Sequence, residues 1–141
     1  MISKRVKYKT SINIFLVLLI PVILFHVSVI AKVIPYKVTW GGRLQNDLEM
    51  YVFESLSILI ILFLGLVLLM KGDYIKLLFK NKTINIILWI FLAIFLLNTI
   101  GNIFAKTNLE KSFAVLTFLF AILIWIILKT KYVTTVNTVQ R

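Results

Sequence analysis

Residues 40–70 read WGGRLQNDLEMYVFESLSILIILFLGLVLLM, a polar stretch that changes abruptly into an apolar one. From residue 55 to residue 70 the run contains no charged side chain. A helix over these residues rises about 24 Å, at about 1.5 Å per residue, which is less than the roughly 30 Å of a bilayer's hydrocarbon core. If this helix spans a membrane, Glu54 is therefore drawn into the outer edge of the bilayer.

The composition of the whole chain indicates an integral membrane protein. Hydrophobic residues make up 61% of the 141 residues and charged residues 15%, and the mean hydropathy is +1.02. A soluble domain of this length could not bury so much apolar surface, so we expect the bilayer to be the solvent. The net charge of +11 is confined to short segments between apolar runs, which argues against nucleic-acid binding. The absence of cysteine excludes disulfides and thiolate metal sites, and we expect no metal and no cofactor.

Four apolar runs predict an all-α protein with a single domain of four transmembrane helices in an up-down bundle. The predicted helices lie at about 11–33, 47–70, 83–104 and 110–129, with an outer loop at 34–46 and a cytoplasmic loop at 71–82. The lysine-rich cytoplasmic loop is typical either of an interfacial helix on an anionic leaflet or of a lysine collar around two helix ends.

The distribution of Lys and Arg predicts the orientation of the bundle. Eleven of these residues lie in the N-terminal segment, the 71–82 loop and the C-terminal tail, and five lie in the two opposite loops. Cytoplasmic segments carry the excess of positive charge, so both termini are expected in the cytoplasm and residues 40–54 outside. We expect a multi-pass protein of the plasma membrane, surrounded by lipids, that forms a homo-oligomer or binds a membrane partner protein.

The outer loop begins with residues suited to a membrane surface and to a turn. Tyr36 and Trp40 are expected at headgroup level, where amphipathic aromatic rings sit best. Gly41 and Gly42 predict a turn with positive φ, because glycine adopts that conformation at little cost. Together with Tyr51, this part of the loop is also the candidate interface for a partner.

A helix start follows the turn. Asn46 and Glu49 form a variant of the capping box, with Asn46 as the N-cap and Glu49 reaching back towards it. Asp47 complements the positive end of the helix dipole. Tyr51 and Glu54 are three residues apart and share one face of the helix. Of the acidic residues in this stretch, only Glu54 is left without a capping role.

Polar residues of all four helices fall at one predicted depth. Counted from the last cytoplasmic lysine of each helix, four of them lie 16 or 17 residues away: His26, Glu54, Asn98 and Ser112. At about 1.5 Å per residue they stand about 24 to 26 Å above the cytoplasmic boundary. Turned inward, they would form an outward-facing polar cluster with Arg43 and Asn102 above it. Ionisable residues within membranes are often functional, so Glu54, His26, Asn98, Asn102 and Arg43 are the candidate ligand-binding residues.

The size and the four-span layout are similar to those of many small bacterial membrane proteins. The single membrane glutamate resembles that of small multidrug transporters, but theirs lies in the first helix and Glu54 lies in the second, so no residue role carries over. A shift of 72 residues also aligns residues 12–14 with residues 84–86 and His26 with Asn98. Such a match suggests a duplicated helical hairpin as one possible origin of the layout.

Three functions of different kinds follow from these patterns. The leading one is binding or transport of a small solute, an ion or a lipid head group at the polar cluster. The second is an accessory or assembly protein whose outer loop docks a partner, with Glu54 holding the helices together. The third is a membrane-embedded enzyme acting on a lipid or quinone. No catalytic residue is assigned, because the sequence contains no recognisable set of nucleophile, base and metal ligands, and an enzyme is the least expected of the three.

Overall fold

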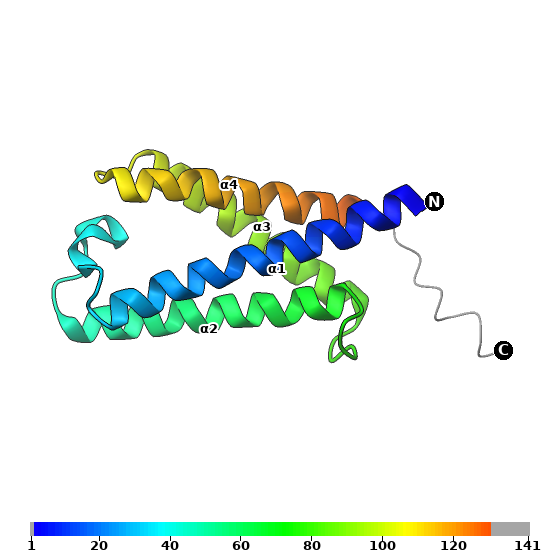
Figure 1. Cartoon of the computed structure of the whole chain (residues 1–141), viewed down its shortest axis with the longest axis horizontal. Coiled ribbons are helices and arrows are strands. Elements are labelled where there is room, and N and C mark those ends of the chain that lie inside the picture. The colour runs from blue at the N-terminus through cyan, green and yellow to red at the C-terminus, as the bar shows by residue number, and fades with distance from the viewer. Residues whose placement is uncertain (1, 131–141) are drawn as a thin grey trace.

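The computed structural model describes residues 2–130 of the chain. Four long helices account for most of them: α1 (Ile2–Ile30), α2 (Asp47–Lys71), α3 (Asn81–Ile103) and α4 (Asn108–Lys129). Two short 3-10 turns, η1 (Tyr36–Val38) and η2 (Trp40–Gly42), lie in the loop between α1 and α2. Figure 1 shows the helices running back and forth along one long axis, with η1 and η2 folded over one end of the bundle.

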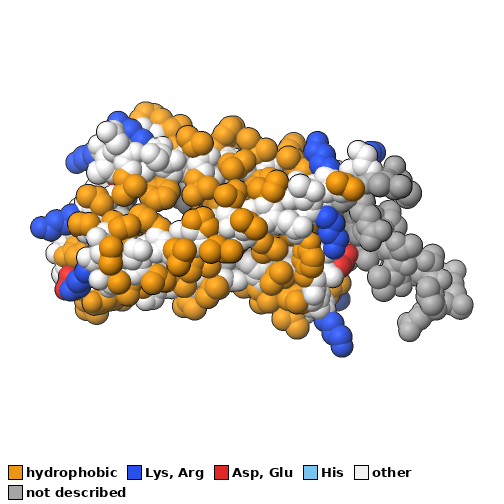
Figure 2. All heavy atoms as spheres, viewed as in Figure 1, with side chains coloured by type: hydrophobic (Ala, Val, Ile, Leu, Met, Phe, Trp, Pro, Cys, Tyr) orange, Lys and Arg blue, Asp and Glu red, His pale blue; other side chains and the backbone are white. Residues whose placement is uncertain are grey.

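All four helices are long and apolar enough to cross a membrane. The candidate spans are Val6–Ile30, Asp47–Lys71, Asn81–Ile103 and Asn108–Lys129. In the space-filling view of Figure 2, hydrophobic side chains cover the flank of the bundle, while Lys and Arg gather at its two ends. This distribution fits the membrane protein that the composition predicts.

The first helix has different bounds from those predicted. It begins at Ile2 instead of near residue 11 and ends at Ile30 instead of residue 33. The basic segment continues the helix because it is fixed to the end of α2: the Tyr8 hydroxyl donates to the Lys71 carbonyl (2.6 Å), and Lys9 donates to the Gly72 carbonyl. These bonds satisfy carbonyls that a helix end leaves without a partner.

The end of α1 is set by a Schellman motif. Lys32 has a positive φ of 58°, the backbone N–H of Lys32 donates to Val29, and that of Val33 donates to Ser28. This arrangement turns the chain out of the helix and satisfies two terminal carbonyls. Glycine is the usual residue at this position, so Lys32 gives no local signal for the motif.

The loop between α2 and α3 is not the interfacial helix that the sequence allowed. Residues 72–80 are irregular, and α2 ends in a second Schellman motif with Asp73 at a φ of 58°. The backbone N–H of Asp73 donates to Met70 (3.1 Å), and that of Tyr74 donates to Leu69 (2.9 Å). The chain is thereby turned back onto the bundle, and Tyr74 bonds through its hydroxyl to the amide oxygen of Asn13. The remaining predicted helix bounds lie within two residues of α2, α3 and α4.

Two apolar clusters hold the helices together. The larger draws buried residues from all four helices, and Phe15 meets Phe95 and Phe120 edge-to-face with ring centroids 6.2 and 4.6 Å apart. The smaller lies at the end that carries η1 and η2, and it contains Val29, Leu44 and Met50. Between membrane helices such contacts stabilise mainly through close packing, since lipid is as apolar as the core. The smaller cluster positions the outer loop and the polar residues beside it.

Candidate functional site

Glu54 is completely buried, and both of its carboxylate oxygens are hydrogen-bonded. It lies in the second turn of α2 with a relative exposure of 0%. His26 Nδ1 of α1 bonds to Oε2, and Trp40 Nε1 of the loop donates to Oε1 at 3.0 Å. A buried carboxylate is tolerated only when it is paired or fully hydrogen-bonded, and these two partners meet that need. Glu54 therefore joins α1, α2 and the outer loop.

The turn Trp40–Gly42, which we call the anchored turn, has an unusual backbone. Trp40, Gly41 and Gly42 have φ values of 53°, 67° and 68°, so three consecutive residues are left-handed. This conformation suits glycine but is uncommon for an aromatic residue. It directs the indole N–H towards Glu54, and the indole ring packs against Phe53 at a centroid distance of 5.2 Å.

A second buried carboxylate holds the same turn from the other side of the bundle. Glu110 of α4 is 6% exposed, and its Oε1 accepts the backbone N–H of Gly41. Its Oε2 accepts the hydroxyl of Thr107 at 2.8 Å, and the Thr107 oxygen in turn accepts the backbone N–H of Glu110 at 3.2 Å. The anchored turn is thus fastened to α2 through Trp40 and to α4 through Gly41.

Sequence reasoning missed both attachments of the turn. Trp40 was assigned to the headgroup layer, and Glu110 was not singled out. The spacing of Thr107 and Glu110 is that of a capping box and could have marked Glu110 as a helix-start residue. No local pattern indicates that Gly41, 69 residues earlier, completes the set.

The predicted cap of α2 is present and has one additional partner, Gln45. The Asn46 side chain accepts the backbone N–H of Glu49 at 2.9 Å. Glu49 reaches back to Asn46 and accepts its side-chain amide at 3.1 Å, and it also accepts the backbone N–H of Gln45 at 2.8 Å. These bonds satisfy donors at the helix start that would otherwise face water.

Asp47 has a partner as well as a place at the helix dipole. It forms an exposed ion pair with Lys32, and this hydrogen bond raises the pKa of Lys32 above its ordinary value. The Lys32 ammonium also lies 5.8 Å from the centre of the exposed Tyr51 ring. Tyr36 is half-buried against the smaller apolar cluster.

Four of the predicted cluster residues do not join Glu54 and His26: Asn98, Asn102, Arg43 and Ser112, whose exposed hydroxyl donates to the Asn108 carbonyl of its own helix at 2.9 Å. Asn98 is exposed, and within residues 2–130 its side chain makes no hydrogen bond. The buried position belongs to its neighbour Thr99, whose hydroxyl meets that of Thr117 at 2.9 Å. One residue turns a helix by about 100°, so Asn98 can have the expected depth and still face outward. Arg43 is exposed and Asn102 half-buried, and neither side chain is hydrogen-bonded in the described part of the chain.

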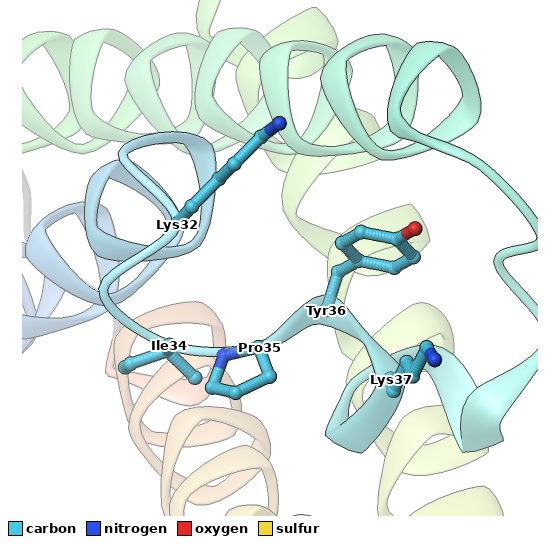
Figure 3. A pocket seen from close by; sticks show the side chains of 5 residues that line it. All are labelled: Lys32, Ile34, Pro35, Tyr36 and Lys37. Carbon is cyan, nitrogen blue, oxygen red and sulfur yellow. The ribbon is translucent and has the colours of Figure 1, made fainter.

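A pocket of about 240 Å³ lies at the same end of the molecule, beside the loop. Its walls come from five residues: Lys32, Ile34, Pro35, Tyr36 and Lys37. Figure 3 shows the Tyr36 ring between the two lysine side chains, with Ile34 and Pro35 along the chain that joins them. Glu54 and His26 do not line this pocket.

The buried carboxylates of Glu54 and Glu110 are occupied by partners within the protein. Each accepts hydrogen bonds from groups of the protein itself, and across residues 2–130 no three His, Cys, Asp or Glu side chains come together as metal ligands. No protein-family model, curated protein or solved structure matches this chain. The two acidic side chains, Glu54 and Glu110, fix the position of one exposed turn, which is a structural role.

Proposed function

We propose that this chain is a multi-spanning accessory protein of the plasma membrane whose outer loop, residues 34–46, docks a membrane partner protein. The observation that carries the proposal is the double attachment of the anchored turn, through Trp40 to Glu54 and through Gly41 to Glu110. A loop already held in one conformation loses little entropy on binding, which makes it suited to recognition.

The accessible side of this loop has the chemistry of an interface. Trp40 is attached by its N–H, yet the residue keeps 43% of its surface exposed. Arg43 and Lys37 are exposed beside it in the sequence. Trp and Arg are enriched among the residues that dominate binding energy at interfaces. The excess of Lys and Arg at the other end of the bundle supports cytoplasmic termini, and the loop then faces outward.

Site-specific photo-cross-linking in intact cells tests the docking proposal. A photoreactive residue at Arg43 is expected to give one discrete cross-linked product, whose mass tells whether the partner is a second copy of this chain or a different protein. The matched control is Val115 of α4, which is 74% exposed on the apolar flank and is expected to give no discrete product. Glu110→Ala should reduce the product from position 43, because it removes the side chain that accepts the Gly41 N–H. Equal products from both positions, or none from position 43, would contradict the proposal.

Binding of a small solute or proton at Glu54 is the second candidate function. It is favoured by one observation: the His26 side chain, which contacts Glu54, is 16% exposed. Against it stands the complete burial of Glu54 with both oxygens occupied. The two functions predict different effects of Glu54→Gln. If Glu54 binds a solute or proton, the variant should lose binding and keep its fold. If Glu54 holds the outer loop in place, the variant should be less stable. For the enzyme hypothesis, the same hydrogen bonds mean that neither oxygen of the Glu54 carboxylate is free to act as a general base.

A further inference from the structure

The pocket beside Tyr36 is distinct from the buried carboxylates, and its mostly apolar lining includes two lysine residues. Lys32 and Lys37 supply the charge, and Ile34 and Pro35 supply the apolar surface. Its position directly follows the membrane span that ends at Ile30, which places it at the level of lipid head groups.

The walls of this pocket are held in place by hydrogen bonds of the backbone. The N–H groups of Val33 and Ile34 both donate to the Ser28 carbonyl, at 2.9 and 3.2 Å. The Thr39 hydroxyl and backbone N–H both donate to the Tyr36 carbonyl, at 2.7 and 3.0 Å. Ile34 and Tyr36 also pack on the smaller apolar cluster. The pocket is therefore preformed, and a ligand need not order it.

The two lysines are in different states. Lys32 gives one of its hydrogen bonds to Asp47, and two of its three donors remain. Lys37 is exposed, and within residues 2–130 its ammonium has no hydrogen bond and no ion pair. With Asp47 included, the pocket region carries a net positive charge, so it favours an anion.

We propose that this pocket binds the phosphate of an anionic phospholipid, with Lys37 as the main contact and Lys32 as the second. Ile34 and Pro35 then face the glycerol and the first part of the acyl chains. The volume of about 240 Å³ lies below the roughly 300 to 1,000 Å³ of pockets that enclose a whole small molecule, which suits a head group whose lipid tails remain in the bilayer. This inference does not depend on the docking of a partner protein.

Photoreactive phosphatidylglycerol in nanodiscs tests the site, with photoreactive phosphatidylcholine as the zwitterionic comparison. Labelling of the peptide that contains residues 32–37, measured by mass spectrometry, is expected to be several-fold higher with phosphatidylglycerol. Lys37→Gln should lower it to the phosphatidylcholine level. Lys106→Gln is the matched control, because it removes an exposed lysine from the loop between α3 and α4, outside the pocket, and should leave the labelling unchanged.

Two further measurements complete the test. Within residues 2–130 the Lys37 side chain makes no hydrogen bond and no ion pair, so Lys37→Gln should unfold at the wild-type temperature, and Lys37→Arg should restore labelling. Equal labelling by the two lipids in the wild type, or equal loss in the two glutamine variants, would overturn the proposal. Displacement of the lipid by millimolar inorganic phosphate would also overturn it, by assigning the pocket to a soluble phosphate.

Discussion

Glu49 and Glu54 lie five residues apart on α2, and they have different roles because one is partly exposed and the other is completely buried. Glu49 is half-exposed and bonds to the backbone at the start of α2, where water can replace the bond if it is lost. Glu54 is completely buried and accepts bonds from His26 and Trp40. Removal of an acceptor from a buried set leaves its donors without partners, and that costs more than loss of an exposed bond.

The variants Glu54→Gln and Glu49→Gln should therefore differ in stability. We expect Glu54→Gln to lower the free energy of unfolding by about 1 to 3 kcal/mol, because the amide keeps the shape of the side chain but loses the charge-assisted bonds. Glu49→Gln should change it by less than about 1 kcal/mol, since its bond is exposed. Thermal unfolding in a detergent micelle measures both. If the two variants unfold at the same temperature, Glu54 does not hold α1, α2 and the outer loop together.

For single residues, the depth of a side chain along its helix can be predicted from the sequence, but the direction in which it points around the helix axis cannot. Counting from the flanking lysines placed His26 and Glu54 at one level, and the structure brings them into contact. The same count selected Asn98, which is exposed, in place of the buried Thr99 next to it. These helices are apolar on every side, so the usual contrast between polar and apolar faces does not reveal which way a side chain points.

Among the elements, the anchored turn is distinguished by three consecutive residues with positive φ. Its positive φ at Gly41 and Gly42 agrees with the turn predicted from the glycine pair, whereas the positive φ of Trp40 has no signal in the sequence. A left-handed aromatic residue costs of order 1 kcal/mol or more, and the bonds to Glu54 and Glu110 offset that cost.

Alanine substitutions at two glycines should have opposite effects. Gly42→Ala is expected to lower stability by about 1 to 2 kcal/mol, because φ is 68° there and an L residue is strained in that region. Gly101→Ala is the control in α3, where the added Cβ meets no atom within 4 Å, and it should raise stability by about 0.5 to 1 kcal/mol. Thermal unfolding of the two single variants measures both effects. If Gly42→Ala raises the unfolding temperature, the positive φ at residue 42 is not needed for stability.

For the whole molecule, the length and spacing of the apolar runs were enough to predict the four membrane-length helices. They were not enough for the ends of α1, which depend on contacts with α2 and on a Schellman motif at Lys32. They also did not indicate that the outer loop folds onto the bundle, because its partners Glu54 and Glu110 belong to two different helices. Contacts of this kind are set by the tertiary structure, and a local pattern of residues does not record them.

The orientation of the bundle can be tested with single cysteines, since the chain contains none. Arg43→Cys lies in the outer loop and Lys76→Cys in the loop between α2 and α3, and both positions are exposed. An impermeant thiol reagent added to intact cells should label position 43 and not position 76, because the lysine-rich end is expected in the cytoplasm. Permeabilised cells, in which both positions should react, are the control. The reverse pattern would place the docking loop in the cytoplasm.

The bond between Gly41 and Glu110 has a consequence for how the chain is made. Its partners are in contact in the folded chain but 69 residues apart in the sequence, where α2 and α3 lie between them. While synthesis proceeds, the loop can bind Glu54 as soon as the second helix is inserted, but it has to wait for the fourth helix before Gly41 finds its acceptor. A chain that stalls after its third helix therefore carries a half-attached loop. The loop reaches its final conformation only after all four helices are inserted. A partially inserted chain therefore does not present the outer surface of the folded protein.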